Sequence, residues 1–66
     1  METARERLLV EGSRDELIAE LRRLEIGWRH LAKDNKAAEA LQGVHDLLTG
    51  STSVRVGHTF YDVTGG

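Results

Sequence analysis

Large apolar side chains recur along the first half of the chain with the period of an α-helix. They follow one another at spacings of four, three, four and three residues, at Leu17, Leu21, Leu24, Trp28 and Leu31. This spacing places them on one face of a helix. A capping box precedes them, because the Ser13 hydroxyl can accept from the amide of Glu16 while the Glu16 carboxylate reaches back. The pattern predicts a helix over residues 13–32.

A second apolar pattern with helical spacing follows after a short polar connection. Its members are Ala37, Ala38, Leu41, Val44 and Leu48. Asp34 or Asn35 can cap the start of this helix, and Gly50 suits the left-handed residue at its end. The sequence therefore predicts a helix over residues 36–49. Because few residues separate the two helices, we expect an antiparallel pair in which each helix covers the apolar face of the other.

The last part of the chain has the alternation of β-strands. Val54 and Val56 alternate with polar neighbours, Gly57–His58 suits a tight turn, and the segment after it is rich in strand formers. We expect a hairpin over residues 53–64, followed by a tail at residues 65–66. A hairpin alone is unstable in water, so it needs a third strand or a helical surface.

Residues 7–11 can supply the third strand. The competing interpretation is a short helix over residues 3–11, capped by Thr3 with Glu6. With the strand, the sequence predicts an α+β fold in one domain of residues 1–66. In this fold an antiparallel two-helix hairpin packs on a small three-stranded antiparallel sheet, made of the N-terminal strand and the C-terminal hairpin.

The facing stripes of the two helices define the predicted core. We expect its centre to contain Leu21, Leu24, Trp28, Leu41 and Val44. Residues 21–36 carry five basic side chains against two acidic ones, which makes a local patch of +3. Phe60 and Tyr61 point to opposite faces of a strand, and we expect Phe60 inside and Tyr61 outside. The predicted partner-binding residues are Arg22, Arg29, Lys33 and Tyr61.

The size of the chain favours self-association. At 66 residues, it can bury only about 60% of the surface that its unfolded form exposes. It contains no cysteine, so no disulfide compensates for the small core. No apolar run reaches the ~18 residues of a membrane span, and the acidic Glu2 and Glu6 do not suit a signal peptide. We expect the protein in the cytoplasm or inside an assembled particle.

The sequence contains no recognisable catalytic motif. The pairs His30–Asp34 and His45–Asp46 are no known ligand constellation, and nothing places His58 near them. There is no cysteine nucleophile, no serine in a nucleophile elbow and no glycine-rich phosphate loop. We therefore expect no enzymatic activity, no metal, no cofactor and no small-molecule substrate. A protein–protein interaction module that binds protein partners is the function that remains.

Two segments resemble parts of a known family. The helix ending Val44–Gly50 with the hairpin after it, and the capped helix from Ser13 to Glu25, are similar to the small head–tail joining proteins of tailed phages, the lambda protein W type. In that family the hairpin lies between the helices, whereas here it follows both, so the elements have a permuted order. The resemblance implies a non-enzymatic structural protein of virion assembly.

Two other classes of function stay open. A winged-helix DNA-binding regulator would also place a hairpin after a helix and would use the basic residues of 22–36. Against it stand the net charge of −2 and the lack of a base-reading Arg, Lys or Asn at 37–48, so we expect only weak, non-specific attraction to DNA. The other class is a small partner-neutralising inhibitor or antitoxin, for which no shared signature exists.

Overall fold

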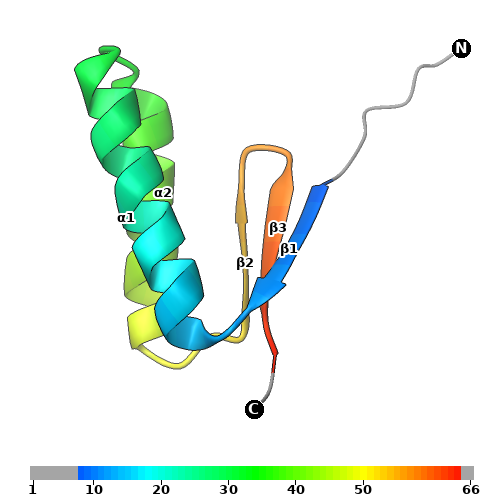
Figure 1. The fold of residues 1–66 in the computed structure, drawn as a ribbon. Helices are drawn as coiled ribbons and strands as arrows, with labels where there is room; N and C mark the ends of the chain where they lie inside the picture. Colours follow the sequence, from blue (N-terminus) through cyan, green and yellow to red (C-terminus); the bar gives the residue numbers. More distant parts are fainter. Residues whose placement is uncertain (1–7, 65–66) are drawn as a thin grey trace, which may run out of the picture.

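Two helices and three strands follow one another along the part of the chain that the computed structural model describes, residues 8–64. In chain order they are β1 (Leu8–Gly12), α1 (Arg14–His30), α2 (Asp34–Leu48), β2 (Ser53–Val56) and β3 (Thr59–Val63). Figure 1 shows α1 and α2 as an antiparallel hairpin that lies beside the sheet. The predicted α+β class and the helical hairpin are confirmed.

The sheet has the strand order β1–β3–β2. The N-terminal strand is confirmed over the helix alternative, although Arg7 and the Thr3 cap lie outside the described residues, as does the tail at 65–66. β2 and β3 pair antiparallel, but β1 pairs parallel to β3, which corrects the all-antiparallel sheet. The helical hairpin returns the chain to the end of the sheet where β1 finishes. β2 therefore runs antiparallel to β1. β3 runs parallel to β1 and is the strand with which β1 pairs.

The start of α1 follows the sequence, whereas the connection to α2 does not. The capping box is present, with Glu16 N donating to Ser13 Oγ at 3.1 Å and Ser13 N donating to Glu16 Oε1 at 2.9 Å. α1 ends at His30, because Ala32 takes a left-handed φ of 60° and turns the chain. Asp34 is already helical, so Lys33 is the N-cap and makes no side-chain cap. The predicted Asp34 or Asn35 cap is wrong.

The core lies where both helices meet the sheet. Its buried side chains are Leu17, Leu21, Ala40, Val44, Leu47, Val54, Val56 and Tyr61. Of the predicted centre, Leu21 and Val44 are buried, while Leu24 and Trp28 pack against the core and are half-buried. Leu41 is 36% exposed, so its placement in the core is wrong. Small residues of α2 face inwards instead, because they let the layers approach closely, and this turns Leu41 outwards.

Arg14 links α1 to the end of α2, on the side of the molecule where β1 leads into α1. Arg14 Nη1 donates to the backbone oxygens of Leu47, at 2.6 Å, and Ser51, at 2.7 Å. The first of these is a carbonyl at the C-terminal end of α2, where a positive charge also suits the helix dipole. We call this half of the molecule, with Leu17, Leu21 and Leu47 at its centre, the closed end.

Candidate interaction groove

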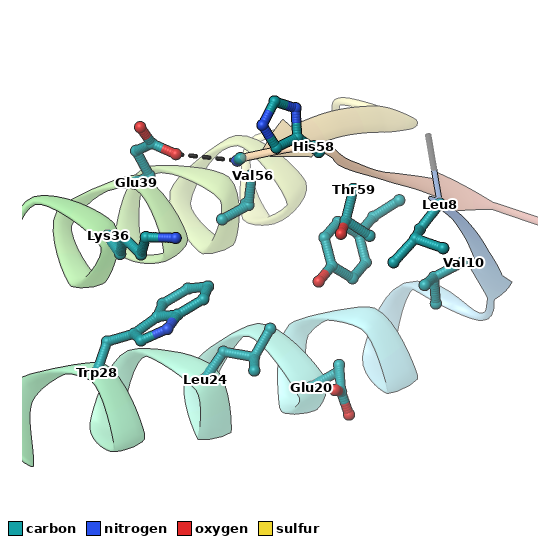
Figure 2. Close-up of a pocket in the computed structure, with 12 residues that line it drawn as sticks. Leu8, Val10, Glu20, Leu24, Trp28, Lys36, Glu39, Val56, His58 and Thr59 are labelled. Atoms are coloured by element: carbon teal, nitrogen blue, oxygen red, sulfur yellow. Dashed lines mark hydrogen bonds between the residues drawn. The ribbon is translucent and has the colours of Figure 1, made fainter. Parts of the chain in front are cut away.

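A groove opens at the opposite half, between α1, the start of α2 and the sheet (Figure 2). We call this half the open end. The groove has a volume of about 510 Å³. Its apolar lining comes from α1 and from the sheet, and consists of Leu8, Val10, Leu24, Trp28 and Val56. The polar groups around it are Glu20, Lys36, Glu39, His58, Thr59 and Tyr61.

The groove exists because α1 is longer than the strands it covers. A helix of 17 residues extends about 25 Å at ~1.5 Å per residue, whereas the five residues of β3 extend about 17 Å at ~3.3 Å per residue. The last two turns of α1 therefore project past the centre of the sheet. Leu24 and Trp28 continue the apolar stripe there, but the sheet does not fully cover them.

Glu39 and Lys36 of α2 shape one side of the groove. Glu39 Oε1 accepts from the backbone N–H of Gly57 at 3.0 Å, which ties the β2–β3 turn to α2. Gly57 has a φ of 63°, a conformation that glycine adopts without steric cost. Lys36 Nζ lies 5.8 Å from the centre of the Trp28 ring, within the range of a cation–π contact. Figure 2 shows Lys36 extending above the Trp28 ring and the Glu39 carboxylate turned towards the β2–β3 turn.

Tyr61 lies under the groove and is not on the outer surface. It is 4% exposed and belongs to the core, so the prediction that it lies on the surface is wrong. The period of a strand fixes only that Phe60 and Tyr61 face opposite sides; Tyr61 is the one that turns towards the helices. Burial raises the pKa of Tyr61 above 10.0, the charge of Glu20 raises it further, and a hydrogen bond with Thr59 acts in the opposite direction.

The three predicted basic contact residues lie apart from Tyr61. Arg22, Arg29 and Lys33 are all exposed, but none of them lines the groove. Arg29 Nε donates to Glu25 Oε2 at 2.9 Å, as the four-residue spacing predicts. The predicted set therefore does not form one site.

Most groove residues were missed in the sequence. The usable signal was the apolar stripe of α1, which is longer than the elements predicted to cover it. Glu39 carried no signal, because Gly57 lies 18 positions away. Leu8 carried none either, since the partner strand of β1 was not known.

The described residues show little that could support metal chemistry. Across residues 8–64, no group of three or more His, Asp, Glu or Cys side chains is placed to hold a metal ion. His30, His45 and His58 lie on α1, on α2 and in the β2–β3 turn. No helix among these residues is long and apolar enough to cross a membrane.

Comparison of the chain with protein-family models, with curated proteins and with solved structures finds no match.

Proposed function

We propose that this protein is a non-enzymatic protein–protein interaction or assembly module that receives an apolar segment of a partner protein in the groove. The observation that carries the proposal is the uncovered apolar lining. Leu24 and Trp28 remain half-buried, and Leu8 on the facing strand is 58% exposed. A partner that covered these three side chains would complete the apolar stripe that α1 begins.

The dimensions and composition of the groove suit side chains of a peptide. A volume of about 510 Å³ falls within the range of ordinary ligand sites, roughly 300–1,000 Å³. Tryptophan is enriched among residues that dominate binding energy, above all when it sits in an apolar pocket with a polar surround. Here Trp28 has that environment, with Lys36 above its ring and Glu20 and Glu39 at the margins.

The narrower form of the proposal is a phage head–tail joining-like structural protein. It rests on the resemblance of the two segments Ser13–Glu25 and Val44–Val63 and on the packing of a helical hairpin against a β-hairpin. Its test is capture of a portal or other structural protein from phage lysate. We expect Leu24→Asp to lose that protein, because it places a charge in the groove, and Arg29→Ala to stay folded and retain it, because Arg29 is exposed outside the groove.

The DNA-binding alternative has less support. The helices of a helix-turn-helix cross at about 90–120°, whereas α1 and α2 lie side by side in Figure 1. A recognition helix also needs basic or amide side chains that reach base edges. Beyond its first turn, α2 carries a single side chain of this kind, Gln42, and its other polar residues are Glu39, His45 and Asp46.

The experiment uses a displayed library of random peptides of about twelve residues, selected on the wild-type protein. Trp28 is the single tryptophan, so its fluorescence reports on the groove when a selected peptide is titrated. We expect Leu24→Asp to abolish the binding of such peptides, because it places a charge in the apolar lining. Arg22→Asp is the matched control on the same helix, since Arg22 lies outside the groove.

Circular dichroism establishes that both variants remain helical. Peptides that bind the Leu24→Asp variant as tightly as the wild type, without changing the Trp28 emission, would contradict the proposal. A library that yields no binder would contradict it as well.

A further inference from the structure

The outer edge of β1 is a further surface that no other element of the described chain covers. β1 is a terminal strand of the sheet within residues 8–64, and nothing among those residues pairs with its outer side. Leu8 and Leu9 are each 58% exposed. Edge strands of monomeric proteins are usually protected by charges, proline or a bulge. β1 begins Leu-Leu-Val and has one charge, Glu11.

The hydrogen bonds of β1 identify which backbone groups face this edge. Leu8 N donates to His58 O at 3.3 Å, and Gly12 O accepts from Thr64 N at 2.9 Å. In a parallel ladder the backbone groups of alternate residues point to the same partner strand. The groups of Leu8, Val10 and Gly12 therefore point to β3. The N–H and C=O groups of Leu9 and Glu11 point to the free edge.

We propose that a second copy of this chain pairs with the protein through this edge, with β1 antiparallel to β1 about a two-fold axis at Val10. Leu9 of each copy then lies opposite Glu11 of the other. In the two copies together, Leu9 and Glu11 present four outward N–H groups and four outward C=O groups. These groups form four interchain hydrogen bonds. The result is a six-stranded sheet with both helical hairpins on one face. The inference rests on the proposed function as an assembly module and names one of its partners.

The side chains of β1 suit this register on both faces of the sheet. On the helix side, the exposed Leu8 lies opposite Gly12, which has no side chain to collide with it. The two Val10 side chains meet at the axis. On the outer side, Leu9 lies opposite Glu11, so no two like charges face each other directly.

The flank of α1 next to β1 is also complementary to itself. A Cβ placed on Gly12 would lie 3.0 Å from Glu16 Oε1, and Val10 lines the groove together with Glu20. Glu20 is already paired with Arg23 in its own copy. Glu16 and Arg23 are seven residues apart and share a side of α1. In the proposed dimer we expect Arg23 of each copy to lie on the side of α1 that faces Glu16 of the other.

A second copy is also the partner that the size of the chain favours. A domain of 66 residues has a small core, and oligomerisation is one of the common ways to stabilise such a domain. An isologous contact needs one surface that complements itself. The edge of β1 meets this requirement in its backbone groups, in its side chains and in the charges of α1 beside it.

The register is tested by two substitutions at one exposed position. Leu9→Glu places a carboxylate opposite Glu11 at both symmetric positions, whereas Leu9→Lys places an ammonium group there. Both remove the same leucine and replace it with a long charged side chain, so the sign of the charge is the main difference between them. Sedimentation equilibrium of the full chain over a range of concentrations gives the dimer dissociation constant. We expect the dissociation constant of the Leu9→Glu dimer to exceed that of the Leu9→Lys dimer by about tenfold. The difference comes from two cross-strand charge pairs, which repel in the first variant and attract in the second.

Two further variants complete the test. Leu9→Glu combined with Glu11→Lys restores opposite charges, and we expect it to recover the dimer. Leu9→Pro removes an outward N–H without breaking a bond to β3, so we expect a folded monomer. Arg55→Pro is its control at the other edge, because Val63 N donates to Thr52 O and the antiparallel alternation then turns the N–H of Arg55 outwards.

Each contrary outcome overturns the proposal. A wild-type chain that stays monomeric at millimolar concentration has no self-pairing edge, and a different protein would then be the occupant of β1. A dimer that Leu9→Glu and Leu9→Lys weaken equally does not have this register, and one that neither changes lies elsewhere. Peptide binding to the groove, measured with the monomeric Leu9→Pro variant, tests the proposed function separately.

Discussion

The closed and open ends of the molecule use the same apolar stripe of α1 in different ways. At the closed end Leu17 and Leu21 are 2% and 0% exposed and belong to one buried core with residues of α2 and the sheet. At the open end Leu24 and Trp28 follow at the same helical spacing and stay half-buried. One continuous sequence pattern thus contributes to stability in its first half and leaves a binding surface in its second.

Small residues account for the tight packing of the closed end. Gly43 of α2 faces Leu21, Val54 and Val56, and a Cβ placed there would lie 3.0 Å from Leu21 Cδ1. Ala40, one turn before Gly43 on the same helix, is also buried. At the open end Gly27 of α1 has no heavy atom within 4 Å of the position of its missing Cβ. The two glycines have opposite environments.

The largest expected effect separates two leucines that are three residues apart. Leu21→Ala removes a fully buried side chain, and we expect a loss of about 3 kcal/mol in the free energy of unfolding. Leu24→Ala removes the same atoms from the edge of the groove, and we expect about 1 kcal/mol. Because small domains have a free energy of unfolding of only about 5 kcal/mol, the first variant should be close to unfolded.

Urea denaturation followed by Trp28 fluorescence measures both variants against the wild type. Equal losses for Leu21 and Leu24 would show that the open end is packed as tightly as the closed end, and the comparison between the ends would be wrong.

Substitution of the two glycines by alanine should change the stability less than the leucine substitutions do. For Gly27 the expected change is a gain in stability, whereas for Gly43 no gain is expected. Alanine is favoured over glycine inside a helix by about 1 kcal/mol. We expect Gly27→Ala to gain most of this free energy, because its methyl group enters open space. Gly43→Ala should show no gain, since its methyl group meets Leu21 Cδ1 at 3.0 Å. Thermal denaturation ranks the two variants, and a higher melting temperature for Gly43→Ala would contradict the tight contact.

Local patterns in the sequence predicted the elements well. The capping box at Ser13, the stripe of α1 and the hairpin at Gly57–His58 each depend on residues within a few positions of one another. The parallel pairing of β1 was not predictable in this way. The distinction between pairing with β3 and pairing with β2 depends on residues more than 40 positions further along the chain.

The candidate groove was less predictable than the fold for the same physical reason. Its shape depends on the lengths of α1 and β3 compared in space, and on the bond between Glu39 and Gly57. Arg14 is a further case, because its contact with Leu47 spans 33 positions. Tyr61 and Phe60 were assigned to the wrong faces, since both are aromatic and alternation alone does not identify the inner face.

The smallest expected effect concerns the proton of Tyr61, which lies between the two ends. Burial, followed by the charge of Glu20, raises its pKa above 10.0 in the folded protein, so the folded state holds the phenol proton more tightly than the unfolded state. The resulting stabilisation is fully present below pH 10 and is lost as the pH rises above it.

Tyr61 is the single tyrosine, so the ultraviolet absorbance of tyrosinate follows it directly. We expect Glu20→Gln to lower the pKa of Tyr61 but to leave it above that of a free tyrosine, because burial is the larger cause. Glu39→Gln, on the far side of the groove, is the control that should leave the titration unchanged. A wild-type midpoint at or below that of free tyrosine would show that water reaches the phenol through the groove, and the boundary between the closed and the open end would then lie beyond Tyr61.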